Sequence, residues 1–193
     1  MEILHLNAGR LQTNCYVVWA EDSNTCAVID PGDEAARILR TIEGRGLQVE
    51  AILLTHGHFD HVGAVKEISK ATGCKVYMNI KDLALPEGLT AGSLYYTDNY
   101  TGTVTAGGLT FTVLDTPGHS EGSVCLMCGD VIFSGDTLFA GTCGRTDLPT
   151  GSWSTIRKSL QMLAALPGDY TVYPGHGPAT TMNTERAENP CIE

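Results

Sequence analysis

The sequence has no long hydrophobic run and little positive charge. No segment approaches the ~18 consecutive apolar residues that indicate a membrane-spanning helix, and the first residues lack the basic start and apolar core of a signal peptide. Lysine and arginine together number 12 against 22 aspartates and glutamates, so the formal net charge is −10. Such an excess of negative charge disfavours nucleic acid as a partner. We therefore expect a cytoplasmic protein that binds neither membrane nor nucleic acid.

The cysteines do not indicate a disulfide framework. There are seven of them, an odd number, and they are spread over the whole chain. Cys125 and Cys128 form a C-x-x-C motif, but the segment around them has the pattern of a strand, in which these two side chains face opposite sides. We therefore expect free, mostly buried thiols and no redox pair.

Short apolar or alternating segments alternate with segments of helical spacing. The 193 residues suffice for one sizeable core, and the 22 glycines indicate many tight turns. The predicted strands are 1–7, 12–20, 25–30, 51–54, 75–78, 101–105, 109–115, 123–128, 131–134 and 170–173. The first predicted helix begins after Asp33 as its N-cap and ends at Gly44 or Gly46. Three more helices are predicted over 62–70, 153–166 and 181–188. Residues 82–100 are the least regular, and we predict a loop over the sheet edge, with a lid as one interpretation.

The two halves of the chain are alike, each with several strands followed by a helix and a strand. No linker separates them, so we expect one domain over residues 1–193. The predicted fold is α/β, a four-layer α-β-β-α sandwich.

The most informative segment is Thr-His-Gly-His-Phe-Asp-His-Val-Gly, residues 55–63, which follows the predicted strand 51–54. His56 and His58 are two apart on an extended segment, so they point to the same side. Asp60 and His61 fall in the first helical turn and face another direction. Imidazole and carboxylate together suit zinc, iron or manganese, and this arrangement suits two adjacent metals better than one.

Three further turns place similar side chains at the ends of predicted strands. Five of the six histidines lie in these four turns, and only His5 does not. The candidate ligands of a first metal are His56, His58 and His119, those of a second are Asp60, His61 and His176, and Asp136 is the candidate bridge. Two divalent cations would lower the pKa of a shared water and polarise a carbonyl oxygen. Asp60 would orient the hydroxide, so Asp60 and Asp136 are the candidate catalytic residues, and we expect hydrolysis of an ester, thioester or amide.

These motifs resemble the metallo-β-lactamase superfamily over nearly the whole chain. The H-x-H-x-D-H signature is His56, His58, Asp60 and His61, and the later ligands follow in the family's order. The ligand set is most similar to glyoxalase II and short glyoxalase II-like hydrolases, and less to class B β-lactamases. The resemblance implies cleavage of a small-molecule thioester such as S-lactoylglutathione, with two divalent metals, zinc first and iron or manganese as alternatives.

The glycine-rich segment 139–147 strengthens this resemblance. Glyoxalase II has a similar loop, in which a lysine that binds glutathione stands where this chain has Arg145. The resemblance implies that Arg145 binds substrate. The alternative is structural, an ion pair with Asp147 that holds the loop.

Two other functions remain open from the sequence. The segment 144–147 is also similar to persulfide dioxygenases, which share the fold and use one iron held by two histidines and a carboxylate to oxidise glutathione persulfide. The other is a structural or regulatory domain that keeps the ligands. The intact ligand set favours an enzyme.

Overall fold

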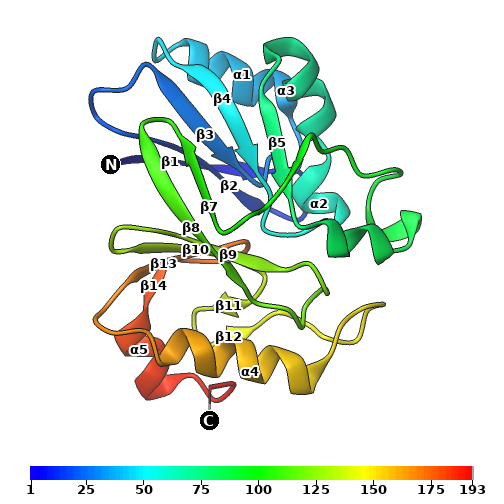
Figure 1. Ribbon diagram of the computed structural model, residues 1–193, viewed down its shortest axis with the longest axis vertical. Coiled ribbons are helices and arrows are strands. Elements are labelled where there is room, and N and C mark those ends of the chain that lie inside the picture. The colour runs from blue at the N-terminus through cyan, green and yellow to red at the C-terminus, as the bar shows by residue number, and fades with distance from the viewer. Residues whose placement is uncertain (193) are drawn as a thin grey trace.

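The computed structural model describes residues 1–192, which form two six-stranded sheets with helices on their outer faces (Figure 1). The helices α1 (Ala35–Glu43) and α3 (Val65–Thr72) lie on one sheet, and α4 (Trp153–Ala164) and α5 (Met182–Glu188) on the other. This arrangement confirms the predicted α-β-β-α sandwich.

The first sheet follows the order of the chain. Its strands are β1 (Glu2–Ala8), β2 (Thr13–Trp19), β3 (Thr25–Ile29), β4 (Gln48–Leu53), β5 (Lys75–Met78) and β6 (Asp98–Asn99). The pairs β1–β2 and β2–β3 are antiparallel, and the pairs from β3 to β6 are parallel. Parallel neighbours need crossover connections, so the carboxyl ends of β3, β4 and β5 lie at one edge of the sheet.

The second sheet is mostly antiparallel. Its spatial order is β14 (Thr180–Thr181), β13 (Thr171–Pro174), β10 (Val131–Gly135), β9 (Val124–Cys128), β8 (Leu109–Asp115) and β7 (Thr103–Ala106). Only β10 and β13 pair in parallel. A small hairpin of β11 (Leu138–Phe139) and β12 (Thr142–Cys143) follows β10.

The apolar side chains form one cluster between each pair of layers. Along β3 and β4, Val28 and Ile52 face the helices, whereas their neighbours Ile29 and Leu53 face the other sheet. This alternation buries both faces of these strands, as in parallel sheets covered on both sides. A third cluster packs α4 and α5 on the second sheet.

The helices α1 and α4 differ in how they are capped. Ser152 caps α4, with its side chain accepting a hydrogen bond from Thr155 N. The prediction that Asp33 caps α1 is wrong, because Glu34 is the N-cap, with φ of 59°, and no side chain caps this helix. Asp33 instead accepts a hydrogen bond from Glu34 N.

The helix predicted over 62–70 is interrupted. A short helix α2 (Phe59–Val62) precedes α3, and the chain bends at Gly63. Gly63 packs against Gly32, where a Cβ would meet the Gly32 carbonyl oxygen, and Ala64 N donates to Pro31 O at 3.0 Å. This backbone contact ends α2 and leaves its residues free to face the sheet edge.

The irregular segment 82–100 contains more structure than predicted. It begins within η1 (Ile80–Ala84), a 3₁₀ helix, continues through η2 (Glu87–Leu89) and ends in the edge strand β6. Within residues 1–192, no helix is both long enough and apolar enough to cross a membrane. The expectation of one domain over residues 1–193 stays a prediction.

A buried glutamate ties α5 to the rest of the second half. The Glu185 carboxylate accepts hydrogen bonds from Gly141 N at 2.9 Å, from Thr180 Oγ1 at 2.6 Å and from Asn189 Nδ2 at 2.6 Å. Glu185 is buried, whereas Glu188 on the same helix is exposed. These bonds connect the helix to the turn between β11 and β12.

We expect Glu185→Ala to lower the free energy of unfolding by about 2–4 kcal/mol, because it leaves one buried donor and two part-buried donors without this acceptor. Glu188→Ala is the matched control and should change it by less than about 0.5 kcal/mol. Urea unfolding followed by circular dichroism measures both. Equal effects of the two substitutions would show that Glu185 does not anchor α5.

Candidate metal centre

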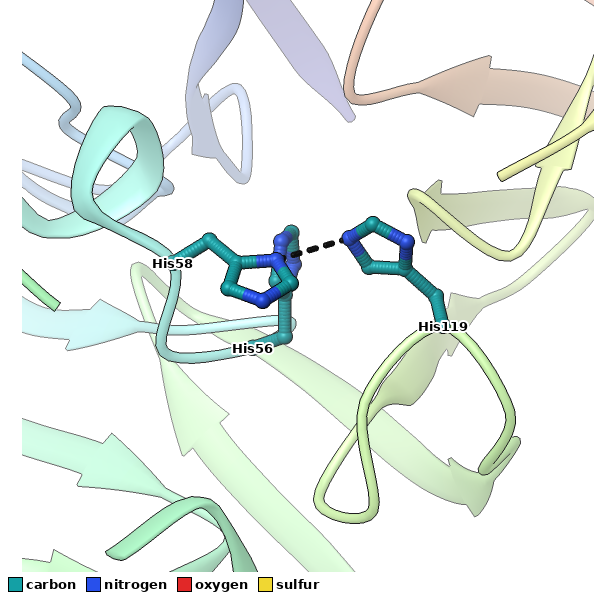
Figure 2. Close-up of side chains that lie close together, drawn as sticks. All are labelled: His56, His58 and His119. Atoms are coloured by element: carbon teal, nitrogen blue, oxygen red, sulfur yellow. Dashed lines mark hydrogen bonds between the residues drawn. The ribbon is translucent and has the colours of Figure 1, made fainter. Parts of the chain in front are cut away.

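Four turns meet at one edge of the two sheets and carry the predicted site residues. They follow β4, β8, β10 and β13, so each begins where a strand ends. The first group is His56, His58 and His119, and its donor atoms all lie within 4.8 Å of one another. Figure 2 shows these imidazoles converging from two turns, with His58 Nδ1 at 2.8 Å from His119 Nε2. All three side chains are buried.

The second group is Asp60, His61 and His176, whose donor atoms also lie within 4.8 Å of one another. Asp60 Oδ2 lies 3.1 Å from His176 Nε2 and 3.6 Å from His61 Nε2. Asp60 and His61 are in α2 and His176 follows β13. Gly63, which packs against Gly32, follows α2 directly after these residues.

Asp136 lies between the two groups. Its Oδ1 is 3.4 Å from His61 Nε2, and its Oδ2 is 3.5 Å from His119 Nε2 and 3.7 Å from His176 Nε2. At Gly175 a Cβ would meet Asp136 Oδ1 and the His61 ring, so the turn after β13 needs glycine there. The structure thus brings together all seven residues predicted from the sequence.

Hydrogen bonds behind the rings set which nitrogen faces the centre. Thr55 Oγ1 lies 3.1 Å from His56 Nδ1, Asp30 Oδ2 lies 2.9 Å from His61 Nδ1, and Arg145 O lies 2.8 Å from His119 Nδ1. An oxygen acceptor behind the ring holds the proton on Nδ1. The unprotonated Nε2 is then the atom that can bind a metal ion.

Four buried side-chain atoms of these residues have no hydrogen-bond partner within the described chain. They are His56 Nε2, His58 Nε2, His61 Nε2 and Asp136 Oδ1. Buried polar atoms without partners are costly and rare, and imidazole nitrogens and carboxylate oxygens are ligands of divalent metals. The residues present therefore fit divalent metal ions.

The electrostatics of the site suit the same ligands. Burial and neighbouring imidazoles lower the pKa of His56 well below its ordinary value and that of His58 to about 4, so both rings are neutral at pH 7. Burial opposes a charge on His61, but the carboxylates of Asp136 and Asp30 outweigh it and hold its pKa well above the ordinary value. Burial would raise the pKa of Asp136, but His61 and the other rings lower it. The neutral rings of His56 and His58 and the ionised Asp136 favour a bound cation, and a metal ion at His61 would displace the proton of that ring.

The first functional residue that the sequence pattern does not identify is Asp30, which lies at the end of the predicted strand 25–30. Its buried carboxylate accepts hydrogen bonds from Thr55 N at 2.8 Å and Thr55 Oγ1 at 2.6 Å, besides its contact with His61. An aspartate at the end of the strand next to β4 was the available signal.

The second missed residue is Asp82, within the segment predicted to be an irregular loop. Its fully buried carboxylate accepts hydrogen bonds from Gly57 N at 2.7 Å, Gly122 N at 2.7 Å and Ser120 Oγ at 3.1 Å. Burial raises the pKa of Asp82, against the effect of these donors. Gly57 lies between His56 and His58, and Ser120 follows His119, so Asp82 joins the two turns of the first group. No local sequence pattern indicates this.

The third is Asn14, near the start of β2. Its Nδ2 donates to Pro174 O and to Gly177 O, both at 2.9 Å, and its backbone N donates to Gly175 O at 2.7 Å. Asn14 thereby holds the turn that carries His176. In the sequence, the feature that could have indicated this role is a polar asparagine at the start of an otherwise mostly apolar strand.

Arg145 lies on the wall of the site, but its side chain is engaged. Its Nε and Nη2 donate to the two carboxylate oxygens of Asp147, each at 2.7 Å, and both side chains are exposed. The structural alternative, an ion pair within the loop, is therefore present. That Arg145 also binds substrate stays a prediction.

The centre opens into a pocket of about 350 Å³. The polar part of its lining comes from both groups and Asp136. The rest is Arg145 and the apolar residues Leu11, Phe59, Leu89, Phe139 and Leu148. A molecule in this pocket would contact the candidate ligands directly.

The chain is similar to known proteins over nearly its whole length. The family model of the metallo-beta-lactamase superfamily matches residues 8–176. The chain is 36% identical to "Hydroxyacylglutathione hydrolase GloC" from Haemophilus influenzae, over 100% of this chain and 97% of that protein.

Solved structures with the same fold cover nearly the whole chain. The crystal structure of BLEG-1 B3 metallo-beta-lactamase has a TM-score of 0.90 and 33% identity, covering 99% of each chain. TTHA1623 in a di-iron-bound form has a TM-score of 0.86 and 39% identity, covering 97% of this chain and 98% of the other. ETHE1 from Myxococcus xanthus has a TM-score of 0.83 and 29% identity, covering 98% and 84%.

We expect Asp82→Asn to lower the affinity of the first group for Zn²⁺ by about 10- to 100-fold, the usual cost of losing a residue that orients metal ligands. An amide has one acceptor oxygen, so it cannot serve both Gly57 N and Gly122 N. Competition with a chromogenic chelator measures the affinity, and circular dichroism checks the fold. Asp98→Asn, on the surface beside Lys75, is the control. An unchanged affinity in Asp82→Asn would contradict the role of this carboxylate.

Proposed function

Because the chain belongs to the metallo-beta-lactamase superfamily, a superfamily of metallo-hydrolases, we propose that it is a dinuclear metal-dependent hydrolase that cleaves a thioester. The observation that carries the proposal is the position of Asp136, whose carboxylate lies within 3.7 Å of rings from both groups of ligands. A cytoplasmic location and a small-molecule substrate belong to the same proposal.

In this proposal the metals are held by the residues already described. One would take His56, His58 and His119, the other Asp60, His61 and His176, with Asp136 shared. Divalent ions there would polarise the substrate carbonyl and lower the pKa of a bound water. Zinc is the first candidate, and the di-iron form of TTHA1623 supports iron as an alternative.

The chain's own residues then orient the reacting groups. Asp60 is ionised, because the hydrogen bond with His176 and the charge of His61 hold its pKa well below the ordinary value despite burial. Thr13 Oγ1 donates to Asp60 Oδ2 at 3.0 Å and so directs the carboxylate. Asp60 can accept a hydrogen bond from the attacking water, and it and Asp136 are our candidate catalytic residues.

The proposed substrate follows from the relatives. The similarity to a hydroxyacylglutathione hydrolase supports a thioester such as S-lactoylglutathione. Arg145 remains a candidate for binding a substrate carboxylate, but this carboxylate would compete with Asp147 for Nε and Nη2.

A second candidate function is a persulfide dioxygenase with one iron. The structural similarity to ETHE1 supports this alternative function. It would need only two histidines and a carboxylate, so it would leave part of this ligand set without a role.

We expect Asp136→Ala to lower thioesterase kcat/KM by more than about 100-fold, beyond the usual effect of a residue that only supports ligands. Without the shared anion, two cations would face each other and each would lose a ligand. Metal analysis should show reduced metal content with an unchanged circular dichroism spectrum. Asp130→Ala, in the exposed turn after β9, is the control. Wild-type turnover by Asp136→Ala would contradict the assignment.

The hydrolase and the dioxygenase are separated by one experiment. Metal-saturated protein should hold close to two metals per chain and should cleave S-lactoylglutathione without oxygen, whereas a β-lactam should be a poor substrate. One metal per chain, with oxygen uptake on glutathione persulfide and no thioester cleavage, would reverse the ranking of the two functions.

A further inference from the structure

Apolar side chains surround the entrance to the metal centre. Leu11 is 53% exposed and Phe59 is 45% exposed, and both line the pocket. Leu89, Phe139 and Leu148 complete this set, which we call the apolar rim. Single exposed leucines are ordinary on protein surfaces, but apolar side chains gathered around one pocket mark a binding site.

The apolar rim is assembled from segments far apart in the chain. Leu11 lies in the turn between β1 and β2, Phe59 begins α2, Leu89 ends η2, and Phe139 and Leu148 come from β11 and the segment after β12. The Phe139 ring lies edge-on to the His176 ring, with centroids 6.2 Å apart. The apolar surface therefore begins directly beside the second ligand group.

The pocket offers little to an anionic substrate group outside the metal centre. Apart from the candidate ligand rings, its lining includes one cationic side chain, Arg145, and Asp147 already binds that guanidinium at two of its nitrogens. The chain as a whole has a net charge of −10. The rim therefore suits an uncharged group.

We propose that the apolar rim binds an uncharged, apolar group of the substrate, on either the acyl or the thiol side of the scissile bond. The proposal rests on the proposed thioesterase function and narrows its substrate class. The pocket of about 350 Å³ lies near the lower end of ligand sites, so it suits a short or medium-length chain. Chain length should then govern kcat/KM, and added negative charge should not help.

Two homologous series test the proposal on the metal-loaded protein. In one, the acyl group grows from acetyl to octanoyl on a fixed neutral thiol, and in the other, the S-alkyl group grows on a fixed acetyl group. We expect kcat/KM to rise about fourfold per methylene in one of the series until the pocket is filled, which corresponds to about 0.8 kcal/mol per buried methylene. The series that rises identifies the side that the rim binds.

Matched leucine substitutions locate the effect. Leu11→Ser should lower kcat/KM for the longest good substrate about tenfold and for the acetyl compound by less than about twofold, since only the longer chain reaches the rim. Leu83→Ser is the control, because Leu83 is 51% exposed but does not line this pocket. It should leave the chain-length dependence unchanged. Leu148→Ser, on another wall of the pocket, should act as Leu11→Ser does.

The binding of n-alkyl carboxylates, measured by calorimetry, separates failure of the rim from failure of the thioesterase. If no thioester is cleaved but affinity rises with chain length and falls in Leu11→Ser, the rim stands and the proposed function falls. If thioesters are cleaved with no dependence on chain length in either series, the rim proposal is overturned. A preference for S-lactoylglutathione over neutral thioesters of equal length, lost in Arg145→Ala, would also overturn it and would favour recognition of a carboxylate.

Discussion

His56 lies between two backbone N–H groups that donate to two buried carboxylates. Thr55 N binds Asp30 and Gly57 N binds Asp82, so the turn after β4 is held on both sides. The same carboxylates extend further, Asp30 to the His61 ring and Asp82 to the turn of His119. Since a buried carboxylate is costly unless hydrogen-bonded, each aspartate is stable only when these segments are in place.

The candidate ligands and the entrance to the pocket come from different kinds of segment. The candidate ligands leave the ends of strands and are held by buried side chains, whereas the apolar rim comes from turns and short helices at the entrance. The chain resembles both a hydroxyacylglutathione hydrolase and a B3 metallo-beta-lactamase over nearly its whole length. The fold is therefore shared by proteins with different names, so the function has to be argued from the site and not from the fold.

Much of the fold was predictable because hydrophobic periodicity is local. The strands at 75–78 and 109–115 match β5 and β8 to the residue. The failures have tertiary causes. The helix predicted over 62–70 is divided because Gly63 packs against Gly32, which lies in an earlier segment. The helix α1 starts after Glu34, and the positive φ of this residue cannot be predicted from a capping pattern.

By itself, the sequence determined the α-β-β-α class and the set of donor residues, because both depend on short patterns and on side-chain chemistry. The sequence also predicted how these residues are grouped around Asp136, and only the tertiary structure decided which buried side chains hold them in place. Asp82 contacts Gly57 and Gly122, 25 and 40 positions away, and Asn14 contacts Pro174, 160 positions away. The apolar rim is likewise drawn from separate segments. Contacts of this kind form only when the two sheets pack face to face. Local sequence patterns do not show which distant residues this packing brings together.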